Sequence, residues 1–333
     1  MAPGTEPLIV ATDRGLYCPP GDFYVDPWQP VQTAVITHAH GDHLRHGSAQ
    51  YFVARPGESL ARYRLGSGHT LAGIEYGVQH SFGTTNVSLH PAGHVLGSAQ
   101  VRIAHGGRVW VVSGDYKLQH DPTCAALEPL ACDVFISEAT FALPVYRWSQ
   151  TRDVIADIAR WWGANRERGL CSMLFCYALG KAQRVLAELR AFTAEPVYVH
   201  GAVGVLVDLY RKAGIAMLPT LLATMERSAD YRGALIIAPP GAAGTPWMRR
   251  FGDHVTGFCS GWMRVRGDRR RCGYDRGFVL SDHADWPALI ETCLATHAPC
   301  VLLTHGRTEA LTRYLNEHGV EARALMTAYS SEE

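Results

Sequence analysis

The stretch Thr37-His38-Ala39-His40-Gly41-Asp42-His43 carries four side chains that can bind a metal within six residues. An apolar, β-branched run from Val31 to Ile36 precedes it, and such a run predicts a buried strand. The four side chains are therefore expected on a loop just after a strand end, where they can point into one cavity. Imidazole and carboxylate groups are ligands that suit zinc and its first-row neighbours. The pattern predicts a metal site rather than a His-rich surface turn.

Three further segments place a potential ligand beside an expected strand end. His94 lies in the glycine-flanked segment 93–97, Asp115 follows the apolar run 109–112, and His305 ends another apolar strand. A carboxylate such as that of Asp115 can bridge two cations. Taken singly, each of these residues could equally be a structural histidine or a turn residue.

The bulk properties describe a globular protein without a strong charge bias. The chain has 333 residues, 47% of them hydrophobic and 19% charged, with a formal net charge of zero. Any nucleic-acid binding must therefore come from a local basic patch. The nine cysteines are odd in number and form no C-x-x-C pair, which favours a reducing cytoplasm. No signal peptide or membrane-spanning segment is predicted, so we expect a cytoplasmic protein without a membrane partner.

The pattern of expected elements changes near residue 145. The first part is rich in short strands, whereas alternating helices and strands dominate from about residue 150, which is typical of a parallel α/β unit. The change near 145 and a return near 281 suggest an inserted domain. Expected strands of the first part are Leu8–Ala11, Val31–Thr37, Gln50–Ala54, Asn86–His90, Ala99–Ala104, Arg108–Ser113 and Asp133–Ser137.

The motif His-x-His-x-Asp-His resembles the signature of the metallo-β-lactamase superfamily. This superfamily contains two-metal hydrolases. The resemblance implies that Asp115 bridges the two metals and that Asp26 braces the ligand loop, a supporting role common at metal sites. It assigns His38, His40 and His94 to one metal, and Asp42, His43 and His305 to the other.

Three more motifs resemble the β-CASP nuclease branch of that superfamily. They are Ser137-Glu138-Ala139-Thr140, Leu280-Ser281-Asp282-His283-Ala284-Asp285, and the segment from Tyr177 to Arg184. The resemblance implies an α/β fold, a metallo-β-lactamase αββα sandwich with an inserted α/β β-CASP cap domain. The expected domains are residues 1–144 and 281–333 for the two parts of the metallo-β-lactamase domain, and 145–280 for the cap.

The same resemblance implies the chemistry. Two divalent ions activate a bridging hydroxide, which attacks the phosphodiester as the nucleophile. Asp42, Glu138 and His283 are the catalytic residues, with His283 as general acid and Glu138 holding its imidazole. Zinc is the expected metal, although the ligand set would also accept manganese or iron.

A basic stretch follows the expected cap strands. Its guanidinium groups can bind phosphates. The aromatic rings of Trp262 and Tyr274, in the same stretch, can stack on bases. A solvated basic loop is the alternative interpretation. Lys181, at an expected helix start, is a further candidate for holding a phosphate. The expected substrate-binding residues are Lys181, Arg264, Arg266, Arg269, Arg270 and Arg271.

The segments Asp22–Trp28 and Ser260–Trp286 are most similar to the bacterial DNA-ligase-associated exonuclease group. That similarity implies a DNA exonuclease in repair, associated functionally with a DNA ligase and a helicase. A histidine at the position of His305 instead accompanies RNA-acting members, so a β-CASP ribonuclease that processes RNA ends is the alternative. A small-molecule metallo-hydrolase, such as a lactamase or thioesterase, is a third hypothesis against which the insertion and the arginines argue.

Overall fold

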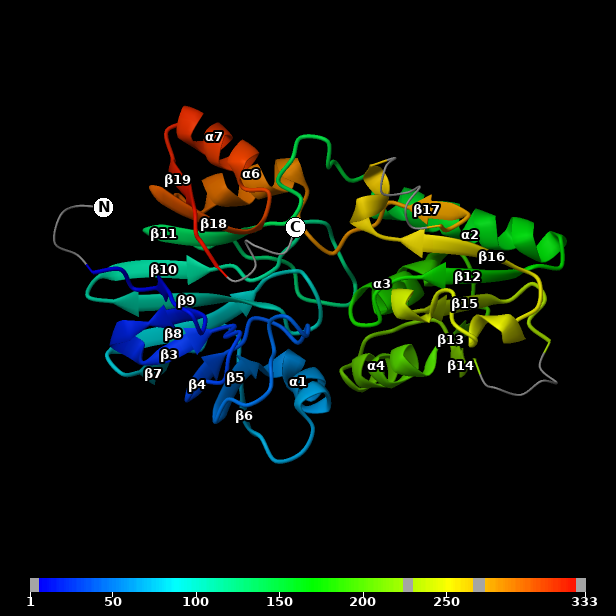
Figure 1. The fold of residues 1–333 in the computed structure, drawn as a ribbon, viewed down its shortest axis with the longest axis horizontal. Helices are drawn as coiled ribbons and strands as arrows, with labels where there is room; N and C mark the ends of the chain where they lie inside the picture. The colour runs from blue at the N-terminus through cyan, green and yellow to red at the C-terminus, as the bar shows by residue number, and fades with distance from the viewer. Residues whose placement is uncertain (1–5, 224–229, 266–272, 328–333) are drawn as a thin grey trace. The chain divides into compact units, whose positions relative to one another are not determined.

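The computed structural model describes residues 6–223, 230–265 and 273–327. The chain divides into two compact units. Because the second unit interrupts the first, the chain leaves unit 1 and later returns to it (Figure 1). Within the described ranges, no helix is long and apolar enough to cross a membrane. Unit 1 comprises Met1–His120, Cys124–Pro144 and His283–Glu333, and unit 2 comprises Asp121–Thr123 and Val145–Asp282.

Unit 1 contains a first sheet whose strands follow one another in chain order. The first two strand pairs are antiparallel and the remaining pairs are parallel. Helix α1 (Glu58–Leu65) connects β5 to β6 and packs against both strands. The strands are β1 (Val10–Ala11), β2 (Leu16–Cys18), β3 (Phe23–Val25), β4 (Thr33–Val35), β5 (Gln50–Ala54) and β6 (Thr70–Ile74); a short 3-10 turn, η1 (Pro19–Gly21), links β2 to β3, and another, η2 (Arg55–Gly57), precedes α1.

The second sheet of unit 1 has the order β19-β18-β11-β10-β9-β8-β7. Its first half is parallel, from β19 through β10, and its second half is antiparallel. Two helices, α6 (Trp286–Ala295) and α7 (Glu309–Glu317), flank β18 in the sequence. The strands are β7 (His80–Phe82), β8 (Thr85–Pro91), β9 (Ala99–His105), β10 (Arg108–Val112), β11 (Val134–Ala139), β18 (Cys300–Gly306) and β19 (Glu321–Ala324).

The two sheets of unit 1 pack face to face around an apolar core. Val35 and Ile74 of the first sheet share this core with Val101 and Ile136 of the second. The alternation of side chains along a strand sends the next residues to the opposite face. On that outer face of the second sheet, Phe135 shares an apolar cluster with Leu289 of α6 and Leu311 of α7. Figure 1 shows these two helices next to β18 and β19. Unit 1 is therefore layered as helix, sheet, sheet and helix.

Four strands of the second sheet end at the same edge. β10, β11 and β18 are mutually parallel, and β8 runs in their direction because β9 is antiparallel to both β8 and β10. The carboxyl ends of parallel strands meet at one edge of a sheet, so the residues that follow them are neighbours. A hydrogen bond from the Ala99 amide to the Thr37 carbonyl ties the loop after β4 to this sheet.

Unit 2 is a parallel sheet with the order β14-β13-β15-β12-β16-β17. Helices α2 (Thr151–Glu167), α3 (Lys181–Glu188) and α4 (Gly201–Lys212) share one apolar core with one face of the sheet. Short 3-10 turns and loops cover the other face. The strands are β12 (Cys171–Phe175), β13 (Val197–Val199), β14 (Thr220–Leu222), β15 (Leu235–Ala238), β16 (His254–Cys259) and β17 (Arg276–Phe278); the turns are η3 (Leu189–Ala191), η4 (Pro240–Ala242), η5 (Met248–Arg250) and η6 (Gly261–Arg264).

The observed elements agree with an α/β fold, and Gln50–Ala54 forms a strand with the expected bounds. The strand expected at Val31–Thr37 is shorter, because only Thr33–Val35 pairs with its neighbours. Helix α1 lies in the part that is expected to be rich in short strands, and its weak hydrophobic periodicity explains why the sequence does not reveal it.

Candidate metal centre

Four side chains converge where the loops of unit 1 meet. His38 and His40 come from the loop after β4, His94 from the loop after β8, and Asp115 from the segment after β10. One ligand atom of each lies within 4.8 Å of the others, although the chain separates them by up to 77 residues in sequence number. His38, His94 and Asp115 are buried. The structure therefore assembles the first predicted metal-ligand group around one point.

The spacing of these ligand atoms fits a small divalent cation. Nδ1 of His40 lies 3.0 Å from Nε2 of His38 and 3.1 Å from Nε2 of His94. Oδ2 of Asp115 lies 3.5 Å from Nε2 of His38 and 3.7 Å from Nε2 of His94. A tetrahedral ion with bonds of 2.0–2.1 Å separates its ligands by about 3.3 Å. The donor set and its spacing both suit zinc.

Burial and neighbouring charges together set the charge of the ligand side chains. It lowers the pKa of His38 well below the usual histidine value, and the neighbouring His43 adds to this effect. Burial and His43 likewise lower the pKa of His305 to about 4. Burial would raise the pKa of Asp115, but His43 and His283 hold it well below the usual value. Neutral imidazoles and an ionised carboxylate are the forms that bind a metal.

Asp115 also faces the second predicted ligand group. Its Oδ2 atom lies 3.5 Å from Nε2 of His43, the same distance as from His38. Nε2 of His43 in turn lies 3.7 Å from Oδ2 of Asp42, a side chain that is 56% exposed. The ring of His305 stacks on that of His43 at 5.5 Å between centroids. One carboxylate oxygen is thus positioned between the two ligand groups.

The second group is less compact than the first. Among the described residues, Asp42, His43 and His305 do not form a cluster with all ligand atoms within 4.8 Å of one another. His305 occupies a β-bulge, because Glu138 pairs with Thr304 while Ala139 pairs with Gly306. Its φ of 60° is in the left-handed region, where a non-glycine residue is strained. Bulges redirect side chains, and this one turns the His305 ring toward His43.

Asp26 supports the ligand loop through hydrogen bonds to Thr37 and His43. Its Oδ1 accepts a hydrogen bond of 2.7 Å from the Thr37 amide, and its Oδ2 lies 2.7 Å from Nδ1 of His43. Burial opposes protonation of His43, but Asp115 and Asp26 outweigh it and raise the pKa of this ring well above its usual value. Asp26 therefore fixes the orientation of His43, with Nε2 directed at Asp115 and Asp42.

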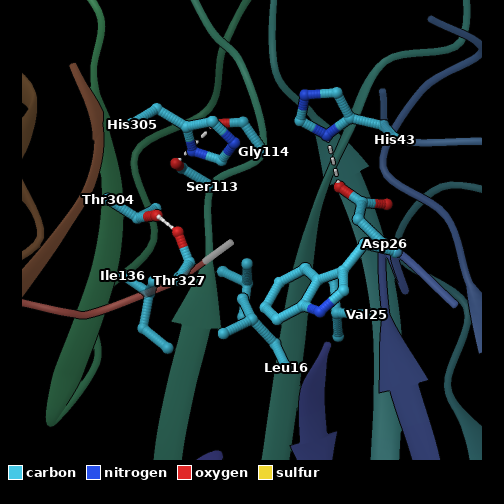
Figure 2. A pocket seen from close by; sticks show the side chains of 12 residues that line it. Leu16, Val25, Asp26, His43, Ser113, Gly114, Ile136, Thr304, His305 and Thr327 are labelled. Atoms are coloured by element: carbon cyan, nitrogen blue, oxygen red, sulfur yellow. Dashed lines mark hydrogen bonds and ion pairs between the residues drawn. The ribbon is translucent and has the colours of Figure 1, made fainter. Parts of the chain in front are cut away.

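A pocket lies beside His43 and His305 (Figure 2). Its walls include the apolar side chains of Leu16, Val25 and Ile136. In Figure 2 the dashed line from His43 to Asp26 marks the brace described above. The apolar wall limits hydration of the second ligand group on this side, which strengthens the electrostatic interactions there.

His283 and Glu138 form a pair beside the ligands. Nδ1 of His283 lies 2.8 Å from Oε2 of Glu138 and 4.0 Å from Oδ2 of Asp115. Glu138 is 1% exposed, and its Oε1 accepts a hydrogen bond of 2.7 Å from the Tyr116 amide. The His283 side chain is 24% exposed. The arrangement holds an accessible imidazole through one nitrogen, as an acid–base histidine requires.

Two residues that the sequence motifs do not single out support the ligand loops. The buried ammonium of Lys117 donates hydrogen bonds to the carbonyls of Gly93 and His94 at 2.5 and 2.9 Å. Nε of Arg64, on α1, donates to the Ala39 carbonyl at 2.6 Å. The position of Lys117, two residues after Asp115, is the only sequence signal that could have indicated this role.

Gly93 and Gly114 permit close approach of these loops. Both have positive φ, 76° and 57°. A Cβ at Gly93 would meet the Lys117 carbonyl oxygen at 2.4 Å, and one at Gly114 would meet the Thr37 side chain at 2.6 Å. Only glycine therefore fits directly before His94 and before Asp115.

The two expected substrate-binding residues that the structure describes, Lys181 and Arg264, belong to unit 2. Lys181 is only 3% exposed, and its Nζ lies 2.7 Å from Oδ2 of Asp282. This buried ion pair does not fit the expected phosphate contact. Arg264 is exposed, and its Nε donates to the Val145 carbonyl at 3.2 Å. Arg266, Arg269, Arg270 and Arg271 lie outside the described residues.

No family model matches the chain. The chain is 30% identical over 321 residues to a protein of Opitutus terrae named probable DNA ligase; the match covers 96% of this chain and 31% of that protein. The chain thus spans about a third of the length of this relative.

Two other relatives match about a third of the chain. Integrator complex subunit 11 of Danio rerio is 32% identical over 108 residues, which are 32% of this chain and 18% of that protein. Endoribonuclease YSH1 of Gibberella zeae is 29% identical over 121 residues, which are 35% of this chain and 14% of that protein.

A crystal structure of a protein of unknown function from Enterococcus faecalis has a similar fold. The TM-score is 0.59 with 11% sequence identity, and the alignment covers 89% of this chain and 79% of the other. At this identity the similarity concerns the fold alone.

Proposed function

We propose that this chain is a metal-dependent nuclease that hydrolyses phosphodiester bonds. The observation that carries the proposal is the position of Asp115. One of its carboxylate oxygens lies 3.5 Å from both His38 and His43, and the same atom lies 4.0 Å from His283. Two-metal phosphodiester hydrolysis needs a carboxylate that bridges the metals and an acid–base histidine next to it.

In this proposal, the first metal would be held by His38, His40, His94 and Asp115. The second would be held by Asp42, His43 and His305 with the same aspartate. When bound, two divalent ions supply an activated water and neutralise the phosphate oxygens. Zinc fits the nitrogen-rich donor set, and manganese and iron are alternatives.

His283 acts as the general acid in this proposal. Nδ1 of His283 is hydrogen-bonded to Glu138, so the proton passes to the leaving oxygen from Nε2 of His283. Glu138 itself is a positioning residue, fixed by the Tyr116 amide and by the Thr140 hydroxyl at 2.5 Å.

We further propose that unit 1 is a metallo-β-lactamase domain and unit 2 a β-CASP cap. The helix, sheet, sheet and helix layering of unit 1 and the parallel sheet of unit 2 are compatible with this assignment. Similarity to Endoribonuclease YSH1 and Integrator complex subunit 11 supports it over about a third of the chain.

DNA is the favoured substrate, with the protein acting as an exonuclease in DNA repair. Similarity to the protein named probable DNA ligase extends over 96% of the chain, which supports a functional association with ligation. RNA is the second candidate. It is supported by the similarity to a protein named endoribonuclease and by the presence of a histidine at position 305.

The test is digestion of end-labelled single-stranded DNA and RNA of matched sequence, with zinc or manganese, beside an Asp42→Ala control. Stepwise shortening of DNA by the unmodified protein alone would support the exonuclease. Cleavage of RNA alone would favour the ribonuclease. Absence of cleavage of either polymer by the metal-loaded protein would overturn the proposal.

A further inference from the structure

Two short segments of unit 2 form an aromatic and basic surface, which we call the Trp262 patch. It consists of Val145–Trp148 and Gly261–Arg264. The ring of Tyr146 lies 5.9 Å from that of Trp148 and 5.9 Å from that of Trp262. Nε of Arg264 reaches back to the Val145 carbonyl, so the two segments are joined by a hydrogen bond as well as by ring contacts.

Each segment is anchored by one buried side chain. Met263 is 1% exposed and packs in the core of unit 2, whereas its neighbour Trp262 is 37% exposed. Tyr146 is 5% exposed, whereas Arg147 beside it is exposed. The anchors fix the backbone, and the alternating residues are therefore presented outward: an indole from one segment and a guanidinium from each.

The composition of the patch matches one class of ligand. Neither segment contains an acidic residue, so Arg147 and Arg264 give it a positive charge. An exposed indole with guanidinium groups in the same two segments offers a flat surface for a base and charge for the flanking phosphates. A purely apolar partner would leave the arginines unmatched, and an acidic peptide would leave the indole without a flat ring to stack on.

We propose that the Trp262 patch binds an unpaired nucleotide of a single-stranded nucleic acid, with the base stacked on Trp262 and the phosphate held by Arg147 and Arg264. This inference rests on the proposed nuclease function and adds a strand preference to it. In a duplex each base is covered by its neighbours and its partner, so the indole cannot stack on it without disrupting the helix. The patch therefore selects single-stranded over double-stranded substrate.

The test is a binding titration with fluorescein-labelled oligothymidylate, the matched RNA, and a duplex of equal length. Every protein carries Asp42→Ala so that the oligonucleotides stay intact. Trp262→Ala is expected to weaken single-strand binding about ten-fold, as the loss of one stacked base does. Trp262→Phe should retain most of the affinity. Comparison of the affinities for the DNA and RNA single strands shows whether the ribose 2′-hydroxyl contributes to binding.

Phe192 provides a matched control, because it is an exposed aromatic residue of unit 2 with nearly the same exposure, 38%. Phe192→Ala should leave binding unchanged. Arg264→Gln should lower the slope of log Kd against log salt by about one, whereas Trp262→Ala should leave that slope unchanged.

The proposal is overturned if Trp262→Ala binds single strands as tightly as the Phe192→Ala control, or if duplex binding falls equally. Failure of the nuclease proposal is distinguishable. In that case the metal-loaded protein cleaves no oligonucleotide, whatever the effect of Trp262 on binding. Cleavage is measured separately on proteins that retain Asp42, and normal cleavage there combined with unchanged binding in Trp262→Ala would reject the patch alone.

Discussion

Units 1 and 2 each bury a cluster of ionisable side chains, but the two clusters are composed differently. In unit 2, Lys181 pairs with Asp282 at 2.7 Å, and Arg184 lies 3.4 Å from Asp282 and 3.6 Å from Asp121. Two cations and two carboxylates therefore balance. In unit 1, imidazoles and the carboxylate of Asp115 converge with their nitrogen and oxygen atoms on one point.

Burial of charge therefore does not by itself mark a functional site. A buried pair that neutralises itself serves structure, and its net contribution to stability is small compared with the cost of breaking it. A buried set of electron-pair donors remains incomplete until a cation joins it. The chemical groups that lack a counter-ion, rather than the degree of burial, therefore indicate which ligand binds.

The largest effect should come from removing the shared carboxylate of unit 1. Asp115→Asn is expected to lower phosphodiester hydrolysis by about 10³-fold or more, because both ligand groups lose their common anion. Bound metal, measured by mass spectrometry, should fall as well. Asp133→Asn is the control, since Asp133 lies just before β11, accepts a hydrogen bond from the Val109 amide of β10, and belongs to neither ligand group. Full metal content and normal turnover in Asp115→Asn would refute the metal assignment.

The next effect separates proton transfer from metal binding within unit 1. His283→Ala should reduce kcat by about 10²–10⁴-fold, the usual contribution of general acid–base catalysis, with metal content unchanged. A substrate whose leaving group needs no proton should restore much of the rate. His80→Ala, an exposed histidine of the same unit, is the control. Loss of metal from His283→Ala would mean that His283 is a ligand instead.

The smallest effect on activity should come from the balanced cluster of unit 2. Lys181→Met is expected to lower the free energy of unfolding by about 3 kcal/mol, because Asp282 loses its closer partner. KM for an oligonucleotide should not change. Lys212→Met, at an exposed lysine, should change stability by less than about 0.5 kcal/mol. A raised KM with unchanged stability would instead restore the phosphate-binding role that the helix position suggests.

Local sequence patterns account for the local features of unit 1. The apolar runs before His38, Asp115 and His305 predict strands, and strands precede or contain all three positions in the structure. These predictions succeed because side-chain alternation and apolar runs are local properties. The α/β character and the change of pattern near residue 145 follow from the same kind of local information.

How these residues meet depends on contacts between segments that are distant in the sequence. The sequence favours a phosphate contact for Lys181, but folding places it opposite Asp282, about a hundred residues further along the chain. His305 reaches His43 through a β-bulge that depends on the register between β11 and β18. The Trp262 patch joins two segments that are more than a hundred residues apart in sequence. Register and long-range contacts are set by packing of the whole core, which no local stretch of sequence encodes.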